Sequence, residues 1–387
     1  MKKLFLLLTL LGMVATGCSK DEGGSEDNFL KNFFTGLDNV IIYYTSSNGK
    51  VVEPYISSAF GATIISNTYK DGVGAIEFNV PITTIGNGAF HGCSSLTSVT
   101  IPDSVTTIGD GAFWECSSLT SVTIPDSVTT IGRSAFNGCS SLTSVTIPDS
   151  VTTIVDNAFY NCSSLTSVTI PDSVTTIGGA AFEGCSSLRE FNGKYASEDG
   201  RCLIVDDTLN SFAPAGLTEY TIPDSVTTIG HNAFRDCYDL TSVTIPDGVT
   251  TIGAWAFGGC SSLTSVTIGN SVTTIGEKAF RDCSSLTSVT IGNSVTTIGE
   301  SAFRDCSSLT SVTIGDSVTT IGYNAFKKCS SLTSVYCKPI TPPDGDFDMF
   351  DNNASGRKIY VPMESVNKYK SAEGWSDYAS DIVGYDF

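Results

Sequence analysis

The sequence predicts a β-solenoid, in which short strands of successive coils stack into a parallel sheet. The first observation is a motif of 23 residues that returns almost unchanged along the chain, as expected for stacked supersecondary units. The second is the strand-like spacing of apolar residues within each copy. We expect about eleven right-handed coils. The isoleucine of Val-Thr-Thr-Ile, or of Ile-Thr-Thr-Ile in the first copy, marks ten of them: Ile85, Ile108, Ile131, Ile154, Ile177, Ile229, Ile252, Ile275, Ile298 and Ile321.

Each copy predicts two strands and a closing turn. The segment 119–124 has a leucine, a valine and an isoleucine that point inward, while a serine and a threonine point to solvent. Proline and aspartate at 125–126 end this strand, because proline cannot donate to the ladder. The β-branched segment 128–131 predicts a second strand on the opposite face, closed by a glycine that can adopt positive φ. Alanine, phenylalanine and cysteine within 135–139 fill the interior.

One coil, at 188–222, departs from the repeat. Residues 201–205 and 208–213 flank an Asp-Asp pair and predict a β-hairpin in place of the usual turn. This hairpin is either a spacer that tolerates a change of length or a binding feature.

The segments outside the repeat predict caps, which a solenoid needs because its end faces are apolar. Strands at 40–44 and 74–78 would cover the N-terminal end, and a strand at 359–362 with a helix at 364–372 would cover the other. The helix places Val366 and Tyr369 on one face. Trp375, Tyr378 and Phe387 are interpreted as cap packing rather than ligand-stacking rings. The predicted divisions are a signal at 1–17, a flexible tether at 18–28, a β cap at 29–80, the solenoid at 81–337 and a C-terminal cap at 338–387.

The first 17 residues are typical of a bacterial export signal, with Lys2 and Lys3 before a short apolar run. Small residues directly before Cys18 resemble the lipobox of bacterial lipoproteins, which implies that Cys18 is lipidated; an ordinary signal with a chance cysteine is the alternative. The segment 19–22, Ser-Lys-Asp-Glu, resembles the sorting tag of Bacteroidetes surface lipoproteins. We therefore expect a lipid-anchored protein of the outer membrane, exposed at the cell surface.

The repeat pattern, Leu-x-x-Val-x-Ile-Pro-x-x-Val-x-x-Ile-x-x-x-Ala-Phe-x-x-Cys, runs from Ile85 to Val335. It resembles the BspA-like leucine-rich repeat family, and the resemblance covers about two-thirds of the chain. It departs from the general leucine-rich pattern at Ser104 and its equivalents, where asparagine or cysteine is usual. The resemblance implies a leucine-rich repeat β-solenoid. It also implies adhesion to host matrix or serum glycoproteins, such as fibronectin or fibrinogen, or to other bacteria.

The chain carries 40 acidic against 21 basic residues, a net charge of −19. Nucleic acid is a poor partner for such a chain, because its binding needs basic patches that neutralise phosphate. We expect no small-molecule substrate either.

Cysteines form a ladder at one repeat position. Neighbouring side chains in register do not supply the torsion of roughly 90° that a disulfide requires, so we expect buried free thiols. Paired Cys-x-x-Cys motifs are missing from the sequence, so no metal site is predicted. Cys202 and Cys337 fall outside the ladder, and their pairing stays open. The ladder is Cys93, Cys116, Cys139, Cys162, Cys185, Cys237, Cys260, Cys283, Cys306 and Cys329.

Catalytic groups do not assemble when equivalent positions are stacked. The two histidines, His91 and His231, occupy different repeat positions, and no phosphate-binding loop is present. We expect no enzyme activity and no cofactor. Aspartates recur after Ile-Pro, and turn capping is favoured over calcium binding because one oxygen per coil falls short of 6–8 ligands. They are Asp103, Asp126, Asp149, Asp172, Asp224 and Asp247, with Asp316 at the equivalent position.

The candidate ligand-binding surface is the exposed face of the main sheet. Evenly spaced hydroxyls can bond sugars or peptides over on the order of 50 Å; the alternative is that threonine simply suits exposed strands. The residues are Thr97, Thr100, Thr120, Thr123, Thr143, Thr146, Thr166, Thr169, Thr241, Thr244, Thr264, Thr267, Thr287 and Thr290.

The sequence leaves three functional hypotheses. The first is a cell-surface recognition lipoprotein that binds an extracellular protein or glycan through this sheet. The second is a structural spacer or component of an outer-membrane nutrient-uptake assembly, which the near-identity of the repeats favours. The third, a glycan hydrolase, needs a carboxylate pair in a cleft, and the stacked repeats predict none.

Overall fold

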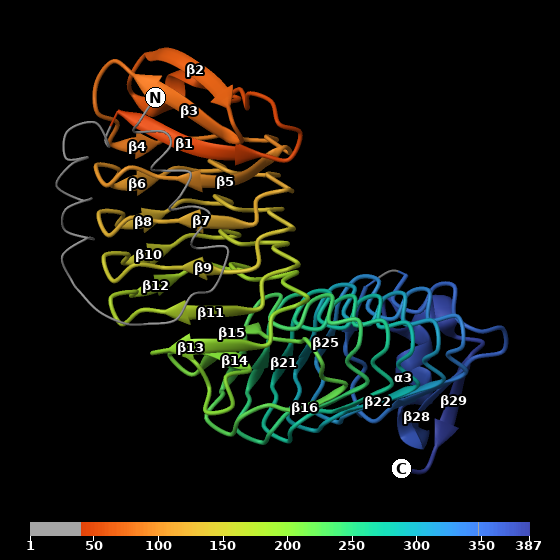
Figure 1. The fold of residues 1–387 in the computed structure, drawn as a ribbon. Coiled ribbons are helices and arrows are strands. Elements are labelled where there is room, and N and C mark those ends of the chain that lie inside the picture. Colours follow the sequence, from red (N-terminus) through yellow and green to blue (C-terminus); the bar gives the residue numbers. More distant parts are fainter. Residues whose placement is uncertain (1–39, 347) are drawn as a thin grey trace. The chain divides into compact units, whose positions relative to one another are not determined.

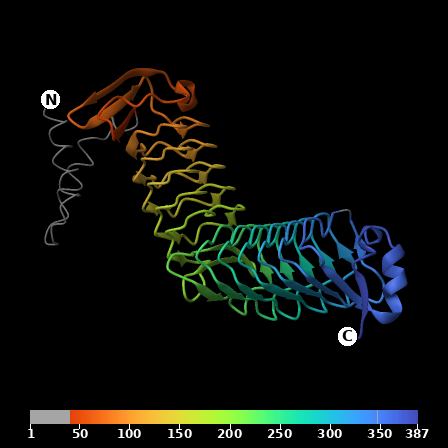
Figure 2. The ribbon, with the colours of Figure 1, turned by 90° about the vertical axis from the view of Figure 1, so that its right-hand side faces the viewer.

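The computed structural model describes residues 40–346 and 348–387. The predicted signal, Cys18, the tether and the start of the predicted N-terminal cap lie outside the described residues. The described chain is a β-solenoid whose coils stack in sequence order (Figures 1 and 2). The predicted fold class is confirmed.

Antiparallel strands begin the described chain. β1 (Ile41–Ser46) lies between β3 (Val73–Phe78) and β5 (Leu96–Thr100), and β2 (Ile64–Lys70) pairs with the other edge of β3. β5 is the first main-sheet strand of the regular coils. Because β1 pairs with it, the antiparallel strands continue the main sheet at its N-terminal end. The strands predicted at 40–44 and 74–78 are confirmed.

Each regular coil contributes one strand to each of two parallel sheets. The main-sheet strands of the first array are β5, β7 (Ser121–Thr123), β9 (Val145–Thr146), β11 (Ser167–Ile170) and β13 (Glu190–Gly193). Its second sheet holds β4 (Thr84–Ile85), β6 (Thr107–Ile108), β8 (Thr130–Ile131), β10 (Thr153–Ile154) and β12 (Thr176–Ile177).

The second array repeats this arrangement. Its main-sheet strands are β16 (Glu219–Thr221), β18 (Ser242–Thr244), β20 (Ser265–Thr267), β22 (Ser288–Ile291), β24 (Ser311–Ile314) and β26 (Ser334–Cys337). The first three of these strands pair as one sheet, and the last three belong to a second sheet. Opposite them lie β17 (Thr228–Ile229), β19 (Thr251–Ile252), β21 (Thr274–Ile275), β23 (Thr297–Ile298), β25 (Thr320–Ile321) and β27 (Asp344–Gly345).

Identical residues stack because the period is constant. Ile108 pairs with Ile131 in parallel register, and the rings of Phe113 and Phe136 lie 5.2 Å apart and 3° from parallel. The glycine after the isoleucine can adopt positive φ, but Gly132 does not. A Cβ there would lie 2.7 Å from the carbonyl carbon of Gly109, so glycine is needed because adjacent coils approach closely.

The predicted hairpin is confirmed as β14 (Cys202–Val205) and β15 (Thr208–Phe212). Its turn residues Asp206 and Asp207 have φ of 47° and 58°, the left-handed conformation of a two-residue hairpin turn. β15 also pairs in parallel with β17, so β14 and β15 are the first two strands of the sheet that lies opposite the second array's main sheet.

The hydrophobic core divides at this hairpin. Leu203 packs in the core of the first array, while Cys202 and Phe212 pack in the core of the second. The stack of phenylalanine rings stops at Phe182, which meets Phe191 edge-on, and restarts at Phe212. The solenoid therefore consists of two arrays of stacked coils, joined by one irregular coil.

The C-terminal segment closes the second array. β28 (Lys358–Pro362) and β29 (Ile382–Tyr385) extend its main sheet, and the predicted helix is the short α3 (Val366–Ser371), preceded by η2 (Met363–Ser365) and followed by η3 (Ser376–Tyr378). Trp375 is fully buried and donates from Nε1 to the Pro343 carbonyl at 2.9 Å. Phe387 was predicted to pack in the cap, but 48% of it is exposed, beside the ring of Tyr385.

Candidate functional site

The predicted threonine face exists as two rows on the main sheet. Twelve of the fourteen threonines are exposed, and Thr97 and Thr241 are half-buried. We call the residues after the strand's leucine the leading row and the residues after its valine the trailing row. The leading row is Thr97, Thr120, Thr143, Thr166, Thr241, Thr264 and Thr287, and the trailing row is Thr100, Thr123, Thr146, Thr169, Thr244, Thr267 and Thr290.

The leading row braces the stack. Thr120 Oγ1 donates to the Thr97 carbonyl at 3.0 Å, and Thr264 Oγ1 donates to the Thr241 carbonyl at 3.1 Å. Thr143, Thr166, Thr241 and Thr287 repeat this bond, so these hydroxyls hold one coil to the next. The Thr97 hydroxyl instead meets the Thr45 hydroxyl at 2.6 Å. Half of the predicted site residues thus have a structural role that the sequence pattern did not reveal.

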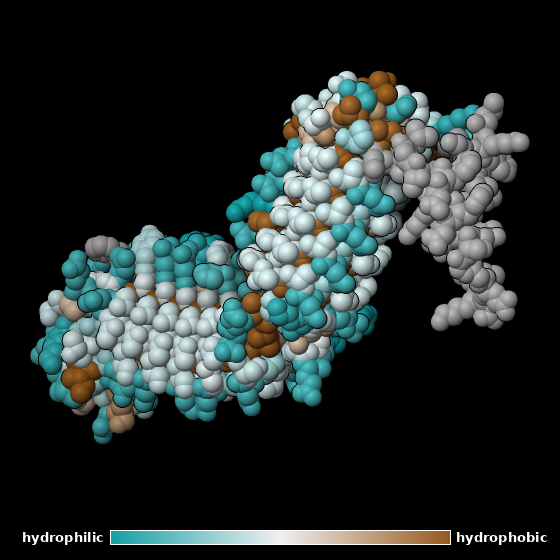
Figure 3. Space-filling view, turned by 90° about the vertical axis from the view of Figure 1, so that its left-hand side faces the viewer, coloured by the Kyte–Doolittle hydropathy of each residue, from teal (hydrophilic) through white to brown (hydrophobic). Residues whose placement is uncertain are grey.

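The trailing row faces solvent. Thr123 pairs in register with Thr100 and Thr146, and no hydrogen bond of its hydroxyl is found among the described residues. Adjacent members repeat at about 4.8 Å, the spacing of neighbouring strands. Figure 3 shows one face of the molecule, on which residues of intermediate hydropathy run in regular rows across the coils.

The row changes character at the C-terminal end. Thr313 pairs with Tyr336, which pairs with Tyr360, and the two tyrosine rings stack at 4.9 Å. Tyr385 meets both rings edge-on. The repeat pattern does not predict this aromatic continuation, because Tyr360 and Tyr385 lie beyond the repeat.

The cysteine ladder is a packing feature. Cys116 Sγ donates to the Phe90 carbonyl at 3.0 Å, and the other buried members of the first array repeat this bond. Burial raises the pKa of Cys139 to about 12 and that of the half-buried Cys93 to about 11. Such thiols are poor nucleophiles, because the thiolate is the reactive form.

The two cysteines outside the ladder are also buried free thiols. Cys202 Sγ lies 3.2 Å from the hydroxyl of Tyr220, and Cys337 Sγ lies 3.4 Å from that of Tyr369. Both cysteines therefore pack against a tyrosine of the same core.

Turn capping by the Ile-Pro-Asp aspartates is only partly right. Asp247 Oδ1 accepts the Asn270 N–H of the next coil. In the first array the serine that follows the aspartate makes the inter-coil bond instead, as from Ser127 Oγ to the Val105 carbonyl. A different carboxylate, Asp110, accepts the Arg133 N–H, and this role was missed.

The histidines do not assemble a reactive group. His91 stacks on Trp114 at 4.8 Å, with Tyr55 edge-on at 5.0 Å, while His231 is exposed in the other array. Across residues 40–346 and 348–387, no three side chains of histidine, cysteine, aspartate or glutamate gather as a metal site would require.

The turn around Ala-Phe varies from coil to coil, in contrast to the uniform sheet, and the residue directly after Ala-Phe is one of its variable positions. The residue after Ala-Phe is aromatic or polar in the first array and mostly basic in the second. This variation is visible in the sequence and was overlooked. We call these residues the variable row: His91, Trp114, Asn137, Tyr160, Glu183, Arg235, Gly258, Arg281, Arg304 and Lys327.

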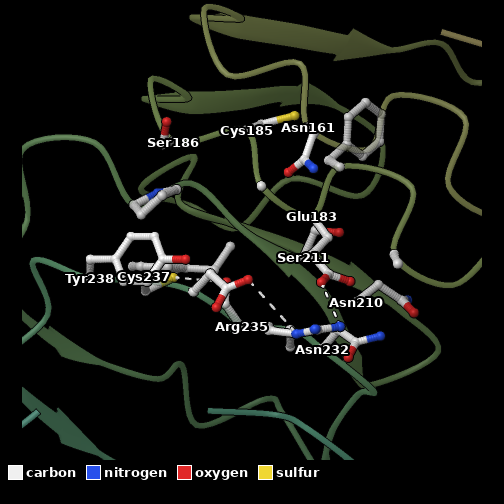
Figure 4. A pocket seen from close by; sticks show the side chains of 17 residues that line it. Asn161, Glu183, Cys185, Ser186, Asn210, Ser211, Asn232, Arg235, Cys237 and Tyr238 are labelled. Carbon is white, nitrogen blue, oxygen red and sulfur yellow. Dashed lines mark hydrogen bonds and ion pairs between the residues drawn. The ribbon is translucent and has the colours of Figure 1, made fainter. Parts of the chain in front are cut away.

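The variable row runs into a pocket at the irregular coil, the junction pocket, of about 120 Å³ (Figure 4). Glu183 of the first array and Arg235, Asp236 and Asn232 of the second line it, with hairpin residues. Glu183 Oε1 lies 3.1 Å from Arg235 Nη1, but the contact lacks hydrogen-bond alignment. The guanidinium also covers the Trp255 ring at 4.6 Å.

Burial dominates the electrostatics of this pocket. The Glu183 side chain is 3% exposed, and this burial raises its pKa to about 7, from an ordinary value of 4.5. Arg235 opposes the rise and Asp236 adds to it. The pocket thus holds a carboxyl group that titrates near neutral pH beside a fixed positive charge.

The family model of the BspA type leucine rich repeat region matches residues 63–192 and 208–333, with six copies. This chain belongs to that family. A leucine-rich cell surface protein from Faecalibacterium prausnitzii A2-165 is 34% identical, over 66% of this chain and 76% of that one, with a TM-score of 0.57. A leucine-rich repeat protein from Eubacterium ventriosum ATCC 27560 is 25% identical, over 67% and 83%, with a TM-score of 0.55.

The pneumococcal vaccine antigen PcpA has the same fold as this chain. It is 21% identical, over 84% of this chain and 88% of that one, with a TM-score of 0.64. None of the curated proteins compared with the chain matches it. In the described part of the chain, no helix is both long and apolar enough to cross a membrane.

Proposed function

We propose that this protein is a non-enzymatic recognition module of the bacterial cell surface, whose main sheet binds an extracellular protein or glycan. The trailing row carries the proposal. Thr100, Thr123 and Thr146 present hydroxyls in parallel register to solvent, and none is used to hold the coils together. Membership of a family with a cell-surface relative supports the cellular location.

Binding by such a row is multivalent. Each hydroxyl can donate and accept one weak bond, and the rigid stack fixes the distance between successive sites. Once one contact forms, the others act at high effective concentration, so affinity grows with the number of coils engaged. The partner class is a host matrix or serum glycoprotein, or its glycan, which offers repeated polar groups. This mode of binding requires neither a cofactor nor a metal.

Attachment to the cell is the second part of the proposal. Cys18 follows small residues after an apolar run, so it is the site of the lipid anchor, and the chain is held at the outer face of the outer membrane. Cys18→Ser should abolish incorporation of labelled fatty acid and release the protein from the membrane fraction. Unchanged labelling would exclude Cys18 as the anchor.

The test of recognition is binding of the full chain to immobilised matrix proteins, serum glycoproteins and glycans at physiological salt. Saturable binding to one of them, lost after thermal unfolding, is the expected result. The absence of binding across the panel would contradict recognition of these partners.

A second function, a spacer or component of a nutrient-uptake assembly, is favoured by the uniformity of the trailing row. A row of identical threonines offers few distinctive contacts for one ligand. Purification of the protein from its native membrane separates the two functions: a stoichiometric transporter partner would favour the assembly.

A further inference from the structure

The junction pocket departs from the uniformity of the repeat. Glu183 stands where the coil before it has Tyr160, and the next member of the variable row, Arg235, belongs to the other array. The two side chains face each other because the irregular coil has its hairpin at this place (Figure 4). Distinctive side chains thus converge here from two arrays.

Two buried acceptors in this pocket lack hydrogen bonds. They are Glu183 Oε1, which meets Arg235 only as a misaligned ion pair, and Asn232 Oδ1. Glu183 as a whole is 7% exposed. A buried acceptor without a donor is unfavourable, so a ligand that brings N–H or O–H groups would relieve a cost the free protein carries.

The charges of the lining select among such ligands. Asp236 and ionised Glu183 outweigh the single positive charge of Arg235. An anion would meet two carboxylates, and an apolar group would leave both acceptors unpaired. A primary ammonium group has three N–H donors and no acceptor, so it fits the charge and the unpaired atoms.

The walls of the pocket suit an alkyl stem behind that ammonium group. Phe182, Phe212 and Pro214 supply apolar surface, and Tyr238, 57% exposed, puts an aromatic ring within the lining. A lysine side chain buries its methylene groups on such surfaces while its ammonium group reaches acceptors, and a neighbouring ring adds a cation–π contact.

We propose that the junction pocket binds a lysine side chain of a protein partner, with Glu183 and Asn232 accepting from its ammonium group. The inference rests on the proposed recognition function and adds to it the chemistry of one specific contact. It places specificity at the junction and leaves the repeated, weaker contacts to the trailing row.

The experiment is ligand-observed NMR with the full chain and Nα-acetyl-lysine-N′-methylamide as the probe. The norleucine analogue, which keeps the stem and lacks the ammonium group, and glucosamine, an amine on a sugar, are run alongside. Glu183→Gln removes the charge and keeps the shape. Glu277→Gln is the control, because that carboxylate is exposed beside Lys278, two coils beyond Arg235, and does not line the pocket.

We expect saturable binding of the lysine probe, no binding of the norleucine analogue, and affinity about tenfold weaker in Glu183→Gln but unchanged in Glu277→Gln. The proposal would be overturned if the lysine and norleucine probes bound equally, or if glucosamine alone bound. It would also be overturned if no probe bound, as expected for a pocket that holds only water. If Glu183→Gln does not fold, Tyr238→Ala, an exposed change, should weaken lysine binding about threefold.

Panel binding by the same chain separates the two proposals. Retained binding to matrix proteins or glycans without lysine binding would contradict the pocket alone. Absence of both panel binding and lysine binding would contradict the proposed recognition function as well.

Discussion

Glu183 and Arg235 occupy the same position of two regular coils on either side of the irregular one, and their side chains meet at 3.1 Å. The hairpin coil contributes no member to the variable row between them. The pair therefore connects two arrays whose phenylalanine stacks and hydrophobic cores are separate.

Stability should depend on pH through Glu183. Its pKa is raised from 4.5 to about 7, so the folded chain holds this proton more tightly than the unfolded chain. The stabilisation that comes from this raised pKa is fully present below pH 4.5 and is lost as the pH rises to about 7. Above pH 7 the titration of Glu183 changes the free energy of unfolding no further, and the total change is at most about 3 kcal/mol. Urea unfolding of the wild type and of Glu183→Gln at several pH values in this range measures the change, as the difference between their free energies of unfolding. Parallel pH curves would contradict the assignment.

Truncation within the phenylalanine stack should be severe. Phe136 is fully buried between Phe113 and Phe159, so Phe136→Ala leaves a cavity and should cost about 3–5 kcal/mol. Phe387→Ala is the control, because that ring is 48% exposed and its loss should change little. Chemical denaturation compares the two, and equal shifts would show that the stack does not stabilise the array.

The two threonine rows should respond differently to valine. Thr120→Val removes a hydroxyl that donates to the Thr97 carbonyl and should cost about 0.5–1.5 kcal/mol. Thr123→Val removes a hydroxyl that has no partner in the described chain and should be close to neutral. A lower melting temperature for Thr123→Val than for Thr120→Val would reverse the assigned roles.

Cysteine reactivity should be low in the folded protein. The thiols of Cys116 and Cys139 are buried and have raised pKa values, so few are thiolates at pH 8. Cys93, which is half-buried, should react first among the ladder cysteines, and Cys93→Ser should remove that phase of labelling. Fast labelling of Cys139 without denaturant would contradict this packing.

The repeat predicted the fold because every coil has the same side chains at the same spacing. Strand positions, the inward valines and isoleucines, and the hairpin at Asp206-Asp207 all followed from periodicity and turn chemistry. The role of Gly132 did not, since the pattern shows that a glycine recurs but not which contact requires it.

The site was less predictable. The fourteen threonines look alike in sequence, and only coordinates separate Thr120, which braces the stack, from Thr123, which faces solvent. The junction pocket depends on a contact between residues 183 and 235 across an irregular coil, which no constant period encodes. The variable row, in contrast, is visible in the sequence, because the residue after Ala-Phe changes from coil to coil.

The proposed recognition by the trailing row is tested most directly by adding charge to it. The triple variant Thr123→Lys, Thr146→Lys and Thr169→Lys is compared with lysines at the exposed Thr129, Thr152 and Thr175, in binding of the full chain to the partner found in the panel. The control threonines directly precede strands of the opposite sheet, and each of their hydroxyls donates to a carbonyl of the previous coil. The account predicts that the first variant loses most of its binding at an unchanged melting temperature, while the second retains it. Equal binding by both would show that the trailing row is not the contact surface.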